Sequence, residues 1–339
     1  MKWSRIAEKL GSALARERLH PAVVAWIEAT SSRERLAVAL SGGADSVALL
    51  LLLWVHFPKR RERLLALHFD HRLRGRASTA DARFCVTLCR GLGIELVGGR
   101  WEDPPPTPSE AEARAARVHF FDKTLRRRRV KALCTGHHRD DVAETLFMRL
   151  ARGAGASGLC APRPVHEQIA LGRTHLRPLL ALDKAALVAA LRDAGAKWRE
   201  DATNATTVHL RNRVRADLVP AWRALAAEPG RDALAGLALS RELLEEDDIA
   251  LEDWAKRVTR IDARGALALA PLRDLPRAVL RRVVHRWIAT LPVRPTLNRI
   301  GFNNLLGLIA PGARIGVRNS LGAKGFALRR RYHLVYVPA

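Results

Sequence analysis

One stretch of the sequence reads Leu36-Ala37-Val38-Ala39-Leu40-Ser41-Gly42-Gly43-Ala44-Asp45-Ser46: an apolar run, a glycine turn, and then a helix-like segment from Ser46 to Val55. The two glycines permit a sharp turn and leave the backbone N–H groups unobstructed by side chains. These N–H groups, the Ser41 and Ser46 hydroxyls and the start of the helix together form a cradle for an anion. We therefore predict a phosphate-binding loop between a strand and a helix.

Asp45 distinguishes this loop from a simple anion site, because a carboxylate repels phosphate. Its presence is explained if Asp45 holds Mg²⁺ against the phosphates of a nucleotide. The loop lacks the Gly-Lys-Ser/Thr of a Walker A motif. The alternative is a glycine-rich turn with an N-cap, but the full pattern in its strand–helix context favours ATP binding. We assign that binding to Ser41, Gly42, Gly43, Ala44, Asp45 and Ser46.

The first half of the chain alternates strand-like and helix-like segments. The strand-like runs are 36–40, 64–69, 94–97 and 131–135, and the helix-like ones are 46–55, 78–93, 109–129 and 140–152. We expect capping boxes at Ser78/Asp81 and Ser109/Glu112. Such alternation with short connections predicts an α/β fold with a doubly wound parallel sheet.

The pattern changes after Pro220. Residues 221–310 look mainly helical, and the tail from Arg314 to Val337 predicts a strand pair around Asn319 to Gly322. We expect two domains, a catalytic one over 1–220 and a mainly helical one over 221–339 that binds nucleic acid.

The charge balance is strongly basic. Lys and Arg total 58 against 34 Asp and Glu, which gives a net charge of +24. Such a surface attracts polyanions, of which nucleic acid is the commonest in a cytosol. The alternative is an arginine-rich proteome from a GC-rich genome.

The four cysteines (Cys85, Cys89, Cys134 and Cys160) form no C-x-x-C pair. We expect core thiols in a reducing compartment and a cytoplasmic protein, because the N-terminus resembles no signal peptide and no apolar run is long enough to cross a membrane.

Three further segments carry polar side chains near the expected strand ends. His68 to Arg74 follows the second strand, where a doubly wound fold meets the adenosine of a nucleotide. Thr135 to Thr145 contains His137, Asp141 and Glu144, which on a helix would share one face. One histidine and two carboxylates at a sheet edge suit Mg²⁺ binding and recognition of an ammonium group. A third, basic segment spans 211–215.

These segments resemble known families. The loop is similar to that of the N-type ATP pyrophosphatases, which adenylate an oxygen and then let a nucleophile displace AMP. The whole set resembles the tRNA(Ile)-lysidine synthetases over about residues 34–220, and more weakly beyond. The segments in family order are the loop, His68-x-Asp70-His71-x-Leu73-Arg74, Gly136-His137-His138-x-Asp140-Asp141-x-x-Glu144-Thr145 with Arg149-Leu150 and Arg152-Gly153, Arg177-Pro178-Leu179-Leu180, and Asn204 followed by Arg211-Asn212-Arg213.

The resemblance implies a two-step reaction on the wobble cytidine of a tRNA(Ile) with anticodon CAU. ATP adenylates the C2 oxygen of cytosine, and the amine of free L-lysine then displaces AMP. The implied roles are Mg²⁺ binding by Asp45 and Asp141, lysine binding by Glu144 and Asp141, adenylate binding by Arg114, Arg211 and Arg215, and proton handling or phosphate contact by His137. The basic runs 126–129, 281–282 and 329–331 would track tRNA phosphates.

Two departures from the family pattern stand out, and several alternatives stay open. Arg72 occupies a position that is usually Gly, and Val118 replaces an aromatic residue. A tRNA thiolase of the same fold, a small-molecule ATP pyrophosphatase and a non-catalytic RNA-binding protein are the competing functions. The sequence does not decide between a monomer and a homodimer.

Overall fold

A computed structural model describes residues 2–73, 75–168, 171–200, 210–225, 232–322 and 325–339. The chain divides into two compact units, Met1–Glu242 and Leu243–Ala339. This division falls C-terminal of the boundary that we expected near residue 220. Each unit is described by itself.

The first unit is built on a six-stranded sheet within the described residues, with the strand order β3-β2-β1-β4-β6-β5. All neighbouring strands are parallel except the β5/β6 pair at one edge. The strands are β1 (Leu36–Ala39), β2 (Leu64–Asp70), β3 (Glu95–Arg100), β4 (Ala132–Cys134), β5 (Val165–Gln168) and β6 (Arg173–Leu176). The expected α/β fold with a doubly wound, mostly parallel sheet is therefore confirmed.

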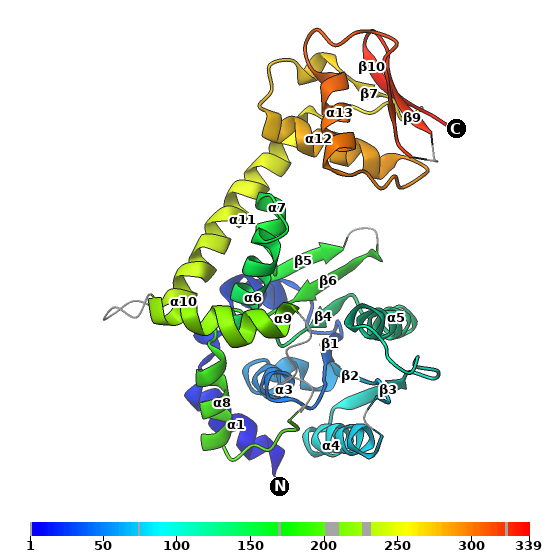
Figure 1. The fold of residues 1–339 in the computed structure, drawn as a ribbon. Coiled ribbons are helices and arrows are strands. Elements are labelled where there is room, and N and C mark those ends of the chain that lie inside the picture. The colour runs from blue at the N-terminus through cyan, green and yellow to red at the C-terminus, as the bar shows by residue number, and fades with distance from the viewer. Residues whose placement is uncertain (1, 74, 169–170, 201–209, 226–231, 323–324) are drawn as a thin grey trace. The chain divides into compact units, whose positions relative to one another are not determined.

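Helices cover both faces of this sheet. The α-helices of the first unit are α1 (Trp3–Ala13), α2 (Pro21–Ala29), α3 (Ala44–His56), α4 (Arg76–Leu92), α5 (Glu110–Arg128), α6 (Arg139–Leu150), α7 (Ala156–Leu159), α8 (Lys184–Asp193), α9 (Leu210–Arg213) and α10 (Val219–Leu225). Helices α1, α3, α4 and α8 share one large core with β1 and β2, and α5 packs on the opposite face. Figure 1 shows α3 and α5 on opposite sides of β1.

Local sequence explains where two of these helices begin. Helix α5 starts with the expected capping box, because Ser109 Oγ accepts from the Glu112 N–H and the Glu112 carboxylate accepts from the Ser109 N–H. The capping box expected at Ser78 was wrong, since α4 begins earlier, after Gly75, which has a φ of 50°. Glycine tolerates this left-handed conformation, so the helix enters from a tight turn instead of a side-chain cap.

The second unit has its own core. It contains most of α11 (Ala233–Val258), the helices α12 (Arg277–Thr290) and α13 (Arg299–Ile309), and, among the described residues, a four-stranded sheet of order β7-β10-β9-β8. The strands are β7 (Leu267–Ala268), β8 (Arg318–Ser320), β9 (Phe326–Arg329) and β10 (His333–Val337), paired antiparallel. The fully buried Trp287 of α12 lies in this core with Leu305 and Leu334. The tail thus forms the strand pair expected around 319–322, as β8 and β9, and adds a third strand, β10, whereas β7 comes from residues 267–268.

Candidate active site

The glycine loop turns its backbone donors inward. The N–H groups of Ser41 and Gly42 each donate to Ser46 Oγ at 3.2 Å, and the Gly43 N–H donates to Ser41 Oγ at 3.3 Å. Gly42 has a φ of 93°, a conformation that L side chains rarely adopt. These three donors and the two serine hydroxyl groups lie at the start of α3, where the sequence predicts an anion cradle. Anion binding there stays a prediction.

A second loop packs directly against this cradle. A Cβ atom on Gly136 would lie 2.9 Å from the Asp45 carbonyl oxygen, closer than real Cβ contacts come, and 3.3 Å from the Ser46 nitrogen, which is a tight contact. Only glycine therefore lets the loop between β4 and α6 approach so closely. This contact places the start of α6 beside Asp45.

His138 is the centre of a carboxylate cluster at that point. Its Nε2 lies 3.3 Å from Asp141 Oδ2 and 3.6 Å from Asp45 Oδ2, and its Nδ1 lies 3.4 Å from Asp140 Oδ2. The side chain is buried. Burial lowers the pKa of His138, but the surrounding carboxylates outweigh burial and raise that pKa to about 10. At neutral pH, His138 is an imidazolium that bridges Asp45 and Asp141.

Asp45 has a second cation beside it and one unsatisfied oxygen. The ammonium group of Lys184, at the start of α8, lies 3.3 Å from Asp45 Oδ2. Burial raises the pKa of Asp45, but His138 and Lys184 outweigh it and hold the pKa below its ordinary value. Asp45 Oδ1 is buried and has no hydrogen-bond partner among the described atoms. Such an oxygen is ready to accept a ligand, because an unpaired buried acceptor is costly.

The basic segment reaches the same cluster from α9 and the π-helical turn η5 (Val214–Leu218). Arg211 donates to Glu144 Oε2 at 2.7 Å and to Asp141 Oδ1 at 2.5 Å. Arg215 donates to both oxygens of Glu144, at 2.5 and 3.1 Å. Glu144 is buried, so these two arginines neutralise it.

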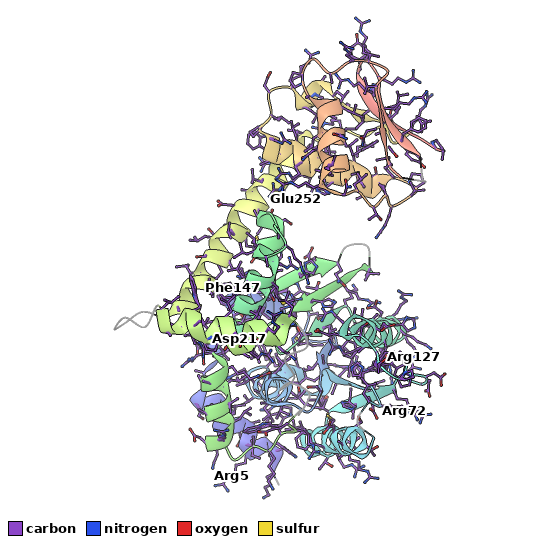
Figure 2. All side chains as sticks on the ribbon, in the orientation of Figure 1. Arg5, Arg72, Arg127, Phe147, Asp217 and Glu252 are labelled. Atoms are coloured by element: carbon purple, nitrogen blue, oxygen red, sulfur yellow. The ribbon has the colours of Figure 1, made fainter. Side chains whose placement is uncertain are left out.

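Packing explains why these arginines arrive there. Val214 and Val219 share a small core with Ala143 of α6. Phe147 of α6, labelled in Figure 2, meets Trp222 of α10 edge-on with ring centroids 5.7 Å apart. Pro220 lies two residues after the end of the π-helical turn η5, in the first turn of α10. Because proline has no N–H to donate, it removes a helical hydrogen bond at this point.

His137 lies in a different environment from its neighbour. Helix α6 begins at Arg139, so His137 precedes it, and the expectation that it shares a helix face with Asp141 and Glu144 was wrong. Its Nδ1 lies 2.9 Å from Thr135 Oγ1. Burial, together with the positive charges of Arg177, Arg211 and Arg114, outweighs Asp141 and lowers the pKa of His137 to about 3. The side chain is therefore neutral and surrounded by cations, which suits contact with an anion.

The residues present fit a Mg²⁺ ion held jointly with a nucleotide. The described residues form no cluster of three or more His, Cys, Asp or Glu side chains that could hold a metal alone. Mg²⁺ typically takes one or two carboxylates plus substrate phosphates and water, not a cage of protein ligands. Asp45, with its unsatisfied Oδ1, meets that requirement beside the phosphate cradle, and Asp141 lies across the His138 ring.

The structure thus gathers most of the side chains singled out from the sequence. Asp45, Asp141, Glu144, Arg211 and Arg215 meet at the carboxyl ends of β1 and β4. Arg114 lies exposed on α5, close enough to influence His137. Arg74 and Asn204 lie outside the described residues.

Two further side chains of the cluster, His138 and Lys184, were not singled out. His138 belongs to the Gly-His-His-x-Asp-Asp motif, whose residue pattern alone does not separate it from its neighbour His137. Lys184 gave no signal of its own in the sequence. The contacts of His138 and Lys184 with Asp45 follow from where α6 and α8 begin in the folded structure.

Arg72 shows what replaces the usual glycine after His71. Its φ is 58°, so the backbone keeps a glycine-like conformation in spite of the side chain. Its N–H donates to Asp70 Oδ1 at 2.7 Å and its guanidinium to the Glu102 carbonyl oxygen at 2.8 Å. These bonds offset a conformational cost of about 1–2 kcal/mol. Arg72, labelled in Figure 2, thus preserves the turn after β2.

Comparison with protein families gives a match to the family described as the PP-loop domain, over residues 15–222. The chain belongs to the PP-loop family. Membership implies that ATP is a ligand of this domain, as the sequence predicted. The assignment of ATP to residues 41–46 stays a prediction. The matched range contains all the side chains of the cluster described above.

The PP-loop chain also resembles whole enzymes. A protein named tRNA(Ile)-lysidine synthase from Geobacter sulfurreducens is 36% identical over 80% of this chain, and this chain covers 58% of that protein. One of the same name from Pseudomonas syringae is 37% identical over 82% of this chain, with 62% of that protein covered. The chain thus spans little more than half the length of these curated relatives.

Among solved structures, the U34-tRNA thiolase NcsA from Methanococcus maripaludis has a TM-score of 0.52 at 19% identity, over 71% of this chain and 78% of that one. This similarity shows the PP-loop fold alone. Among the described residues, no helix is both long enough and apolar enough to cross a membrane.

Proposed function

We propose that this protein is a tRNA(Ile)-lysidine synthetase that acts in the cytoplasm. It would join L-lysine to C2 of the wobble cytidine in a tRNA(Ile) with anticodon CAU and convert ATP to AMP and pyrophosphate. One observation supports the proposal most. The cluster of Asp45, His138, Asp141 and Glu144 lies at the glycine loop, and Arg211 and Arg215 contact two of its carboxylates. The names of the relatives from Geobacter and Pseudomonas support the same activity.

In the first step, the C2 oxygen of cytosine attacks the α-phosphate, and the bond to pyrophosphate breaks. The inward N–H groups of Ser41, Gly42 and Gly43, with the Ser46 hydroxyl and the backbone of Ala44, would bind the pyrophosphate. Lys184 would turn from Asp45 to the same phosphates. Donors already held in place stabilise developing charge without the cost of reorganisation.

Mg²⁺, held by Asp45 and Asp141, would neutralise charge on the phosphate oxygens. Arg211 and Arg215 are adenylate ligands in this proposal, yet the structure pairs them with Asp141 and Glu144. We propose an exchange in which the adenylate phosphate draws the arginines, with Arg114, away from these carboxylates. Asp141 is then free for the metal and Glu144 for an ammonium group.

In the second step, the neutral ε-amine of lysine attacks C2, the bond to the AMP oxygen breaks, and the amine loses a proton to solvent. Glu144, vacated by its arginines, and Asp141 would bind the lysine. This exchange predicts that lysine binds productively only after the adenylate has formed. His137 is neutral and surrounded by cations, so we assign it the contact with phosphate rather than proton transfer.

The alternative function, a tRNA thiolase, would call for reactive cysteines near the loop, and the cysteines of this chain do not support it. Cys85 and Cys89 lie on the core side of α4, Cys134 lies in β4 and Cys160 follows α7, and all four side chains are buried. Burial raises the pKa of Cys85 and Cys89 to about 12, so neither is a nucleophile at neutral pH.

The test is formation of AMP from ATP in the presence of tRNA and lysine. Asp45→Asn should lower that rate at least about 100-fold, the scale of losing one group that stabilises the transition state, while tRNA binding stays within a factor of about two. The matched control is Asp193→Asn, which removes an exposed carboxylate at the end of α8 and should leave the rate unchanged. Full turnover by Asp45→Asn would contradict the assignment of Asp45.

A further inference from the structure

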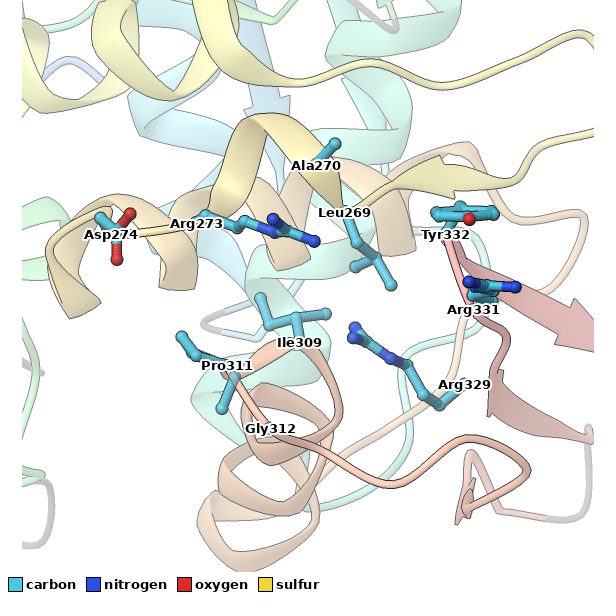
Figure 3. Close-up of a pocket in the computed structure, with 11 residues that line it drawn as sticks. Leu269, Ala270, Arg273, Asp274, Ile309, Pro311, Gly312, Arg329, Arg331 and Tyr332 are labelled. Atoms are coloured by element: carbon cyan, nitrogen blue, oxygen red, sulfur yellow. The ribbon is translucent and has the colours of Figure 1, made fainter.

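The second unit contains a cavity that the reaction at the PP-loop does not use. It has a volume of about 320 Å³ and lies between the end of α13, the turn η6 (Ala270–Leu272) and the turn that joins β9 to β10. Leu269, Ile309 and Pro311 supply apolar lining, and Arg273, Arg329, Arg331 and Tyr332 supply the polar side chains (Figure 3).

The guanidinium groups of this cavity lack acidic partners. Figure 3 shows Arg273 and Arg329 directed into the same space, while the carboxylate of Asp274 lies away from both. Within the part of the chain that the structure describes, no ion pair joins Arg273, Arg329 or Arg331 to a carboxylate. Other arginines of the same unit differ, because Arg286 pairs with Glu252 at 2.6 Å and Arg282 pairs with Asp248.

Arg329 is only partly explained by its structural contacts. One of its N–H groups donates to the Leu308 carbonyl oxygen at 3.1 Å, which satisfies the C-terminus of α13. Its Nε is buried without a hydrogen-bond partner among the described atoms. Burial and the positive charge of Arg273 lower the pKa of Arg329, so the protein holds two cations at an unfavourable distance. An anion between them would relieve this repulsion and satisfy the buried donor.

The rim of the cavity adds an aromatic surface. Tyr332 is 57% exposed, and the Arg331 guanidinium lies 5.2 Å from the centre of its ring. The Leu269 N–H donates to the Tyr332 carbonyl oxygen at 2.9 Å, which fixes the turn that carries both residues. An exposed ring beside unpaired arginines is typical of surfaces that stack a base next to a bound phosphate.

We infer that this cavity binds one nucleotide of an RNA backbone, with the phosphate between Arg273 and Arg329 and the neighbouring base against Tyr332. Arginine suits the phosphate because its planar fork donates two parallel hydrogen bonds to phosphate oxygens. The identity of the RNA as tRNA rests on the proposed function, whereas the chemistry of the cavity does not. The second unit would in this way hold the substrate at a point separate from the adenylation site.

The test is the affinity of the full chain for a tRNA(Ile) transcript and for an unrelated tRNA, measured by fluorescence anisotropy over a range of salt concentrations. Arg273→Glu should weaken binding of both RNAs at least about tenfold and reduce the slope of log affinity against log salt by about 0.7–0.9, the value for one phosphate contact. Tyr332→Ala should weaken binding at constant slope, and Tyr332→Phe, which keeps the ring, should restore it.

The matched control is Arg299→Glu, which makes the same charge change at the opposite end of α13, an exposed position about 16 Å from the cavity by helix rise. If Arg273→Glu and Tyr332→Ala bind both RNAs as Arg299→Glu does, the inference is wrong. The proposed function is judged separately by lysine transfer with the unaltered chain. A loss of RNA affinity in Arg273→Glu alongside no lysine transfer would support the cavity and refute the lysine reaction.

Discussion

His138 holds together the charges of the active site at the scale of single residues. Asp45, Asp140 and Asp141 each lie within 3.6 Å of its ring nitrogens, and all four side chains are largely removed from water. Carboxylates this close repel one another unless a cation stands between them. The imidazolium of His138 is therefore a positioning group that keeps Asp45 and Asp141 ionised and near each other.

The neighbouring histidines give a matched test of this account. His138→Gln should lower the free energy of unfolding by about 3 kcal/mol, because it leaves buried carboxylates without their cation. His137→Gln should lower the free energy of unfolding by less than about 1 kcal/mol, because it replaces an uncharged ring. Urea unfolding followed by circular dichroism measures both, and equal losses for the two variants would contradict the assigned charges.

The sequence identified Asp45, Asp141 and Glu144 because their residue types and motif spacing carry the chemistry. It did not separate His137 from His138, since adjacent residues point in different directions and the difference depends on where α6 begins. Lys184 reaches Asp45 from a position 139 residues further along the chain, a contact set by tertiary packing alone. At Arg72 the sequence departs from the family's usual glycine, yet the backbone has a positive φ that glycine would also adopt.

At the scale of elements, the site depends on two loops that touch and on one basic segment. The strands β1 and β4 are neighbours in the sheet, so the loops that follow them meet at its carboxyl edge. Gly136 permits that meeting, and α9 with η5 brings Arg211 and Arg215 over α6.

Gly136→Ala tests the contact between the loops. The added methyl group would lie 2.9 Å from the Asp45 carbonyl oxygen, so the loops must separate, at a cost of about 1–3 kcal/mol in the free energy of unfolding and with a lower rate of AMP formation. Gly98→Ala is the control, because its Cβ would meet nothing within 4 Å. Similar behaviour of the two variants would show that the close approach does not matter.

Arg215 and Arg213 test the basic segment. Arg215→Gln should slow AMP formation about 10- to 100-fold, because the variant loses one cation for the adenylate and leaves Glu144 with Arg211 alone. Arg213, exposed on the same segment, should tolerate the same change within a factor of about two. Single-turnover kinetics with saturating ATP would reveal the difference, and an unaffected Arg215→Gln would rule out adenylate binding by that side chain.

The order and type of the central strands and helices could be predicted from apolar periodicity, because buried parallel strands and amphipathic helices have distinct patterns. The start of α4 could not be predicted in this way. Ser78 and Asp81 have the spacing of a capping box, but both lie inside the helix, which begins after the positive φ of Gly75. The edge strand β5 and its neighbour β6 could not be predicted either, because short strands with mixed polarity carry little periodic signal.

The molecule as a whole has two compact units and a net charge of +24, which suits a PP-loop protein that binds a large polyanion. The charge is balanced locally in the active site, where each arginine of the basic segment that reaches the cluster meets a carboxylate. It is unbalanced in the cavity of the second unit. In the proposed function, binding of tRNA should therefore depend more on the cavity arginines of the second unit than on the paired arginines of the active site.

The buried thiols make a prediction about pH for the folded chain. Burial raises the pKa of Cys85 from its ordinary value of 9.0 to about 12, and that of Cys89 likewise. The folded state keeps thiol protons that the unfolded state releases, so the contribution of these two thiols to stability should be constant below pH 9 and should fall as the pH rises above it. Native protein at pH 8 should resist iodoacetamide at all four thiols, and urea should expose them; rapid native alkylation would contradict the burial.

The central claim is that the nucleophile of the second step is lysine and that its acceptor is one particular tRNA. The most direct measurement is incorporation of labelled L-lysine into a tRNA(Ile) transcript with anticodon CAU, with and without ATP, beside a methionine tRNA that has the same anticodon. We expect labelling of the isoleucine tRNA alone, and only with ATP. No labelling, while AMP is still released in the presence of tRNA, would preserve the adenylation and contradict lysine as the nucleophile.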